Sequence, residues 1–281
     1  MLGGPKNEMC FARKVDEEDF TEFSLSHDCI GEGHSVCLYE GVGFIFTGGK
    51  GTEKQCHLYR VTEQNWEKLP DLTRGRYSHG SVCIDGVVYA LGGVYQSSKL
   101  KDVECLNIQN DKQWAALPSF PTELDNVKTV TVNTQCIYSG GVEMINSGYR
   151  CNREDLAMWS YDIVKQTHEK KATLITSIGS NISFSIVHTQ NRIFLYEGTQ
   201  QNFLVHFVPL NSWCTLTPPK TKHFTGALAV YDRRVMLLGG EGEEDVTEEY
   251  NTDTITWSLS HFQLPKFTSN VSMFAVKPFT T

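Results

Sequence analysis

A glycine pair that ends an apolar, strand-like run recurs along this chain and constrains its fold more than any other feature. The pairs stand at residues 48–49, 92–93, 140–141 and 239–240, and residues 197–198 hold the variant Glu-Gly. The first residues of these pairs are separated by 44, 48, 57 and 42 positions. Recurrence at such a period is the signature of an architecture built from one repeated supersecondary unit. The chain is therefore expected to be an array of similar units.

The unit is clearest between residues 81 and 114. Two apolar runs, residues 81–84 and 87–91, flank the dipeptide Asp85-Gly86, which is typical of a tight antiparallel hairpin. A third alternating run covers residues 102–108, and a fourth begins at Gln113-Trp114. The pattern predicts a four-stranded antiparallel sheet, which is too small to bury its faces without neighbouring sheets.

The amino-terminal pair Gly3-Gly4 adds a sixth unit. It lies 45 residues before Gly48, and counting from Gly239 past the carboxyl terminus to Gly3 also gives 45 steps. A closed ring keeps its period across the junction of the termini, whereas a linear stack has no reason to do so. We therefore expect one domain over residues 1–281 with six blades. Residues 270–277 should supply the first strand of a closing blade made from about residues 1–27 and 268–281.

The remaining units repeat the same order of strands. Unit three has runs at residues 127–132, 135–141 and 158–163, with its longest connection at residues 142–154. Aromatic residues recur seven positions apart, as Tyr59 and Trp66 or Tyr250 and Trp257, and are expected to pack between neighbouring sheets. No segment is long, capped and periodic at 3.6 residues, so the sequence predicts an all-β fold with almost no helix.

Composition excludes several classes of function. The formal net charge of −8 and the pI of about 5.6 disfavour nucleic acid as a partner, because phosphate binding needs a basic face. No apolar run approaches the ~20 residues of a membrane span, and the amino terminus lacks a signal-peptide pattern. Nine cysteines, an odd number without a C-x-x-C motif, suit a reducing compartment. We expect a soluble, cytoplasmic protein without a membrane or nucleic-acid partner.

No motif for catalysis, cofactor binding or metal binding is complete. Residues 48–51 lack the spacing of a phosphate-binding loop, and the nine histidines are scattered without metal-ligand spacing. No G-x-S-x-G elbow occurs. The sequence therefore predicts a non-catalytic protein without a cofactor or metal ion.

The order strand, Gly-Gly, Tyr and Trp, at roughly 45–50 residues, resembles the kelch repeat, and six copies resemble the six-bladed kelch β-propeller. The tryptophan-aspartate propeller is disfavoured because none of the five tryptophans precedes an aspartate. Segments such as residues 76–93, RYSHGSVCIDGVVYALGG, look most like the kelch-like family, whose members join BTB and BACK domains to such a propeller.

The resemblance implies a protein-binding role. Members of the kelch-like family act as substrate-recognition subunits of cullin-3 ubiquitin ligases, and they contact cullin-3 through BTB and BACK domains, which these 281 residues do not contain. Two alternatives stay open: an actin-binding or scaffolding kelch protein, and a kelch-fold enzyme like those of the galactose oxidase and sialate mutarotase families. The expected partner is a degradation substrate or a cytoskeletal protein.

The resemblance also implies that the partner binds on the connections between blades and on the loops after each glycine pair. Fourteen residues before each pair, where the chain starts the innermost strand of a unit, the residue is always polar. These strand-start residues are His34, Ser78, Asn126, Ser183, Thr225 and Asn270. They form a polar ring at one mouth of the channel, or they only satisfy the local backbone. Around them we expect a partner-binding site that includes Lys50, Arg74, Arg76, Tyr77, His79, Tyr95, His223 and Glu241.

Charge is expected to divide this face. Units one and two carry Lys50, Lys54, Arg74 and Arg76, whereas unit five carries Glu241, Glu243, Glu244, Asp245, Glu248 and Glu249. Such a face would orient a charged partner peptide, with an acidic stretch over the basic residues. A run of acids is often only a solvated loop, and that interpretation also stays open.

Overall fold

The computed structural model describes residues 2–3, 9–12, 21–24, 30–146, 152–172, 174, 183–231, 233–240 and 246–260. The described residues between 28 and 180 form one compact body, the larger body, and those of 1–27 and 181–278 form a second, the smaller body. Both are built from antiparallel sheets, and the one helix among these residues is a single 3₁₀ turn, Val208–Leu210. The all-β prediction is confirmed.

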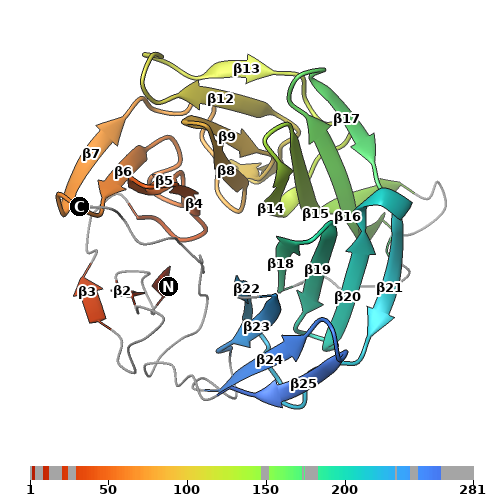
Figure 1. The fold of residues 1–281 in the computed structure, drawn as a ribbon. Coiled ribbons are helices and arrows are strands. Elements are labelled where there is room, and N and C mark those ends of the chain that lie inside the picture. Colours follow the sequence, from red (N-terminus) through yellow and green to blue (C-terminus); the bar gives the residue numbers. More distant parts are fainter. Residues whose placement is uncertain are drawn as a thin grey trace. The chain divides into compact units, whose positions relative to one another are not determined.

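The larger body contains three four-stranded blades, each with its strands in chain order across the sheet (Figure 1). The first blade has β4 (Ser35–Tyr39), β5 (Gly43–Thr47), β6 (Cys56–Arg60) and β7 (Asn65–Leu69). The second has β8 (Gly80–Ile84), β9 (Val87–Leu91), β12 (Val103–Asn107) and β13 (Ala115–Leu117), with the hairpin β10 (Val94–Tyr95) and β11 (Ser98–Lys99) in its middle connection. The third has β14 (Asp125–Asn133), β15 (Cys136–Asn146), β16 (Asn152–Asp162) and β17 (Thr167–Lys170). The first strands β4, β8 and β14 lie side by side.

The smaller body contains two four-stranded blades and one three-stranded sheet. The fourth blade has β18 (Phe184–Thr189), β19 (Arg192–Glu197), β20 (Asn202–Phe207) and β21 (Ser212–Leu216). The fifth has β22 (Ala227–Tyr231), β23 (Arg234–Leu238), β24 (Thr247–Asn251) and β25 (Thr256–Leu259). The three-stranded sheet has β1 (Leu2–Gly3), β2 (Met9–Ala12) and β3 (Thr21–Ser24).

The prediction of six four-stranded blades is wrong, because the described residues form five. The amino-terminal unit has three strands, in which Leu2 pairs with Cys10 and Met9 pairs with Ser24. The glycine pair at residues 3–4 keeps the spacing of the repeat, but spacing alone does not supply a fourth strand. Residues 270–277, to which the spacing assigns that strand, lie outside the described residues.

The hairpin predicted at Asp85-Gly86 is present. Ile84 pairs with Val87 across the turn, and the two turn residues have φ of 49° and 77°. A two-residue turn with both residues left-handed matches the twist of the flanking strands, and Asp-Gly tolerates that conformation. The dipeptide therefore fixes the register of β8 against β9.

Most of the predicted connection at residues 142–154 is strand. The β15–β16 ladder continues past Gly141 and extends as far as the pair formed by Asn146 and Asn152. The glycine pair at residues 140–141 therefore lies inside a strand, and neither of its glycines has a positive φ. Alternation in the run after Gly141 favours pairing over a loop.

The aromatic residues spaced by seven positions lie opposite one another. The ring centroids of Tyr59 and Trp66 are 5.1 Å apart, and those of Tyr250 and Trp257 are 5.3 Å apart. Each pair joins the third and fourth strands of a blade in direct register. Because Trp257 is also buried with Phe203 of the fourth blade, its ring links the packing of two neighbouring sheets.

Candidate functional site

The loop face of the larger body is the end that carries the connections between second and third strands and between successive blades, residues 48–55, 70–79, 92–102 and 118–124. The Gly49 N–H donates to the Arg76 carbonyl at 3.0 Å, and Tyr77 and Val94 exchange both backbone hydrogen bonds, at 3.0 and 2.9 Å. A Cβ on Gly48, where φ is 64°, would lie 2.3 Å from the Arg76 carbonyl oxygen, so only glycine lets these connections touch. The loop face is therefore pre-organised by its own backbone.

Three of the six predicted strand-start residues lie close together in the larger body. The Ser78 N–H donates to the Gly33 carbonyl, beside His34, at 2.7 Å, and the Ser78 carbonyl accepts from the Val127 N–H, beside Asn126, at 2.9 Å. The structure therefore brings His34, Ser78 and Asn126 together.

The other three strand-start residues lie elsewhere. Ser183 and Thr225 belong to the smaller body, and Asn270 lies outside the described residues. The Ser183 carbonyl accepts from the Gly198 N–H at 3.0 Å, and the Thr225 hydroxyl oxygen is buried without a hydrogen-bond partner in the described part of the chain.

Tyr77 and Lys50 form the most clearly defined exposed pair of the loop face. The Lys50 Nζ lies 5.4 Å from the centroid of the half-buried Tyr77 ring, a cation–π geometry. The same Nζ lies 3.0 Å from the Glu32 carboxylate, and its hydrogen bond to Glu32 raises the pKa of Lys50. Exposed ion pairs contribute little to stability, so this lysine can exchange Glu32 for another carboxylate at small cost.

Arg74 and Tyr95 lie on the same face. Arg74 is half-exposed and pairs with Asp102 at 2.9 Å. Tyr95 is half-buried on the β10–β11 hairpin and packs over Gly75, where a Cβ would lie 2.7 Å from the tyrosine ring. Both residues therefore belong to the connections that adjoin Tyr77, whose backbone is bonded to Val94 of the same hairpin.

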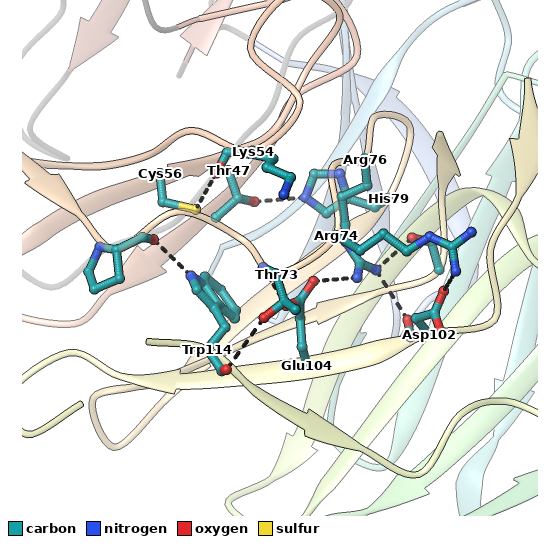
Figure 2. A network of polar contacts seen from close by, with 12 residues as sticks. Thr47, Lys54, Cys56, Thr73, Arg74, Arg76, His79, Asp102, Glu104 and Trp114 are labelled. Atoms are coloured by element: carbon teal, nitrogen blue, oxygen red, sulfur yellow. Dashed lines mark hydrogen bonds and ion pairs between the residues drawn. The ribbon is translucent and has the colours of Figure 1, made fainter. Parts of the chain in front are cut away.

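Arg76, in contrast, is wholly buried. Its Nη2 lies 2.5 Å from the Glu104 carboxylate, and its Nη1 donates to the carbonyls of Gly92 at 2.9 Å and Asp102 at 3.1 Å. Figure 2 shows the Arg76 and Glu104 side chains pointing toward one another. Burial lowers the pKa of Arg76, and the charge of Glu104 opposes that shift. The expectation that Arg76 is an exposed contact is wrong, because a carboxylate from β12 holds it inside the blade.

His79 is also buried, with 3% of its surface exposed. Its Nε2 hydrogen-bonds to the Thr47 hydroxyl at 2.8 Å (Figure 2), whereas its Nδ1 has no partner among the described residues. Burial, reinforced by the charge of Arg76, lowers the pKa of His79 well below 6.5, so the ring is neutral at pH 7. The expectation that His79 is an exposed contact is therefore wrong as well.

The fifth blade repeats the buried pair with a histidine in place of the arginine. His223 is fully buried, and its Nδ1 donates to the carbonyl of Gly239, which follows 16 residues later, at 2.6 Å. Arg76 bonds the Gly92 carbonyl across the same 16-residue separation. The His223 Nε2 lies 3.4 Å from the carboxylate of Glu248, the second residue of β24. His223, which was predicted to contact the partner, is therefore buried inside the blade and has no surface to offer one in this structure.

Glu248 does not belong to an acidic surface. It is buried and accepts hydrogen bonds from the Thr221 hydroxyl, the Thr221 N–H and the Lys220 N–H. Burial alone would raise the pKa of Glu248, but these hydrogen bonds bring it below its usual value. Glu249 pairs with Arg234 at 2.5 Å. The remaining acids of the predicted acidic side, Glu241, Glu243, Glu244 and Asp245, lie outside the described residues.

Comparison with known proteins agrees with the repeat geometry. Residues 75–121, which include β8 to β13, match the model of the Kelch motif. The chain carries a kelch repeat and is similar to proteins of the kelch-like family.

The kelch-like relatives match most of this chain at low identity. It is 21% identical over 267 residues to Kelch-like protein 26 of Danio rerio, which covers 89% of this chain and 42% of the relative. It is 22% identical over 294 residues to Kelch-like protein 36 of Bos taurus, which covers 97% of this chain and 46% of the relative. The match to Kelch-like protein 23 of Homo sapiens is 22% over 239 residues and covers 80% and 40%. The chain spans less than half the length of these curated relatives.

The sequence contains a recurring spacing that could have indicated the buried pairs of Arg76 with Glu104 and of His223 with Glu248. Blades two and five each have a basic residue sixteen residues before the glycine pair and a glutamate as second residue of the third strand, Arg76 with Glu104 and His223 with Glu248. A basic residue and an acid that recur at matching positions of two repeats indicate a contact between them, and its place beside buried strands indicates burial.

Within the described ranges, no group of three or more His, Cys, Asp or Glu side chains is arranged to hold a metal ion, and no helix has the length and apolar character needed to cross a bilayer. Burial raises the pKa of the Cys83 thiol to about 12, which makes it a poor nucleophile. The loop face carries the Tyr77 ring with the Lys50 cation over it, a combination suited to binding another protein.

The neutral, buried His79 predicts acid sensitivity. The folded-state pKa is lowered, so below about pH 6.5 the unfolded chain binds a proton that the folded chain does not, and stability falls as the pH falls toward the lowered value. A whole proton of difference corresponds to about 1.4 kcal/mol per pH unit. Urea unfolding between pH 5 and 7 should show that the free energy of unfolding falls as the pH falls. His79→Gln should reduce the slope of that dependence by up to about 1.4 kcal/mol per pH unit. Lys112→Gln, an exposed control at the opposite end of the blade, should keep the slope, and an unchanged slope in His79→Gln would rule out His79 as its source.

Proposed function

We propose that this chain is a protein-recognition module that holds a partner segment against the loop face of its larger body. We further propose that it is the substrate-recognition part of a cullin-3 ubiquitin ligase adaptor. Similarity to kelch-like proteins supports both proposals, and the geometry of Tyr77 supports the first. The proposed role requires no catalytic step, cofactor or metal ion.

The geometry of Tyr77 is the observation that carries the proposal. Its N–H and carbonyl are both bonded to Val94, and its ring is half-buried beneath the Lys50 ammonium. A tyrosine fixed in this way loses little conformational freedom on binding. Tyrosines are enriched among the residues that contribute most to interface affinity. Tyr77 is therefore the proposed anchor, with Tyr95 beside it.

The flanking cations would orient the partner. Lys50 and Arg74 are each paired with a single exposed acid, Glu32 and Asp102. An acidic group on the partner can replace either acid at a small cost in free energy. This favours partners with acidic residues near the anchor. Arg76 has no part in this contact because it is buried.

Partner capture by paired variants tests the recognition proposal. Lys50→Glu with Tyr77→Ala should weaken capture about 30-fold or more, since losing a hot-spot tyrosine typically costs 2 kcal/mol or more. The matched control is Tyr39→Ala with Lys112→Glu, at the opposite end of the same body, which should capture the partner normally per folded molecule. Equal capture by both variants would contradict the proposed site.

The ligase proposal has a separate test. A partner captured through the loop face should accumulate in cells that lack the natural full-length protein, and re-expression of the Lys50→Glu and Tyr77→Ala variant should fail to lower it. A partner that is captured but has the same lifetime in cells with and without the protein would support the recognition proposal and contradict the ligase proposal.

A further inference from the structure

Three basic side chains from three adjoining blades lie close together in the larger body. His34 precedes β4, His79 precedes β8, and Lys128 lies on β14. Burial lowers the pKa of His34, the Gly31 carbonyl raises it, and the charge of Lys128 lowers it further. Burial also lowers the pKa of His79, with contributions from Arg76, His34 and Lys128. The backbone hydrogen bonds from the Ser78 N–H to the Gly33 carbonyl and from the Val127 N–H to the Ser78 carbonyl place the three residues on adjoining strand starts, which agrees with these effects.

Lys128 has no counter-ion in the part of the chain that the structure describes. Several other lysines of the larger body are paired, for example Lys50 with Glu32 at 3.0 Å, Lys68 with Asp71 at 3.4 Å and Lys165 with Asp162 at 3.1 Å. The side chain of Lys128 is exposed, and no described carboxylate pairs with it. An ammonium without an acid beside it is free to bind an anion from outside.

Two further features distinguish the strand starts around His79: a buried nitrogen left unpaired by the described residues, and backbone strain. The His79 Nδ1 is buried without a hydrogen-bond partner among the described residues, although buried polar atoms are normally paired. Ser78 and Asn126 have φ of 52° and 48° outside hairpin turns, and Asn126 lies where the β14–β15 register shifts between Asp125 and Lys128. Such bulges re-aim side chains, and backbone strain of this kind gathers at functional sites.

We propose that Lys128 and His34, with His79 behind them, bind an oxyanion, either a carboxylate or a phosphate group. An ammonium and an imidazole N–H are suitable donors for either group. That the oxyanion is carried by the protein partner rests on the proposed function, whereas the existence of the site does not. This site deepens the loop-face proposal, because it lies at the strand starts that adjoin Tyr77 and Ser78.

Binding of the oxyanion is coupled to protonation of the histidines. The groups facing the two rings are Lys128, Arg76, the Thr47 hydroxyl, the Gly31 carbonyl and the Phe46 ring, and no described carboxylate contributes to either pKa shift. A bound anion favours the protonated rings, so the complex takes up protons. Affinity for an anion of constant charge should therefore rise as the pH falls.

Titration with inorganic sulfate and phosphate tests the site without any partner. In low-salt buffer we expect the His34 ring resonances of the 281-residue chain to shift on titration, and sulfate affinity to rise from pH 8 to pH 5.5. Lys128→Gln should weaken sulfate binding about tenfold, and Lys128→Arg should retain it. The matched control Lys112→Gln should bind as the wild type does. No His34 shift, or equal sulfate affinity in Lys128→Gln and Lys112→Gln, would overturn the site.

Partner capture identifies the source of the oxyanion. Reduced capture by Lys128→Gln, with normal melting temperature, assigns the oxyanion to the partner. Lost sulfate binding with unchanged capture would overturn that assignment and support a free anion as the ligand. Because sulfate binding needs no partner, failure of the protein-recognition proposal would leave this result interpretable.

Discussion

Replacing Arg76 with methionine is expected to lower the free energy of unfolding by about 3–5 kcal/mol, the usual cost of breaking a buried ion pair by removing one partner. The variant leaves the Glu104 carboxylate, 4% exposed, without its cation at 2.5 Å, and it leaves the carbonyls of Gly92 and Asp102 without their donor. The Thr73 N–H still donates to Glu104, but one amide does not replace a guanidinium. Chemical denaturation of the purified chain measures the loss.

Two variants control for this interpretation. Arg74→Met removes an exposed pair with Asp102 and should cost at most about 1 kcal/mol. Arg76→Met combined with Glu104→Met removes both charges, so it should cost less than Arg76→Met alone. If Arg76→Met were as stable as Arg74→Met, that result would contradict the buried ion pair and would support Arg76 as an exposed contact.

Replacing Trp114 or Trp257 with alanine is expected to cost about 3–5 kcal/mol, as for other large-to-small core changes. The two side chains are 4% and 7% exposed. The Trp114 Nε1 donates to the Pro70 carbonyl at 2.9 Å, and the Trp257 Nε1 donates to the Thr217 carbonyl at 2.8 Å. Each indole thus ties the outer edge of a blade to the connection that leaves the preceding blade. Thermal and chemical unfolding measure the effect.

Phenylalanine variants separate packing from hydrogen bonding at these tryptophans. Trp114→Phe keeps most of the buried ring and should lose about 1 kcal/mol for the hydrogen bond to Pro70. Trp66, which is only half-buried, is the control for alanine replacement and should cost less than Trp114. Loss of partner capture in a stable Trp114→Ala protein would instead assign that residue to the binding site.

The strands of each blade could be predicted from the sequence because they depend on patterns between residues that are close in sequence. The Asp85-Gly86 turn, the alternation of β8 and β9, and the Tyr-to-Trp spacing all act within one blade. The number of blades depends on whether distant segments complete a sheet, which spacing does not determine. At residues 3–4 the glycine pair recurs beside a three-stranded sheet. At residues 140–141 the pair lies inside a long strand.

Burial in the connections could not be predicted from local pattern, because these segments have no strand or helix period. Arg76 and Tyr77 are neighbours in sequence, yet one is fully buried and the other half-exposed. The difference arises from Glu104, which lies 28 residues after Arg76 and forms an ion pair with it. Lys128 was missed for a related reason, since a lysine in an alternating strand normally indicates a solvated face. The register shift near Asn126 is visible only in the structure.

Photo-crosslinking from single positions tests the central claim, that the loop face of the larger body binds the partner, most directly. A photoreactive phenylalanine derivative placed at Tyr77 should crosslink to the captured partner, and the same derivative at Tyr39, on the opposite end of the first blade, should not. Crosslinks from position 39 and none from position 77, with the partner still captured by both proteins, would contradict the claim.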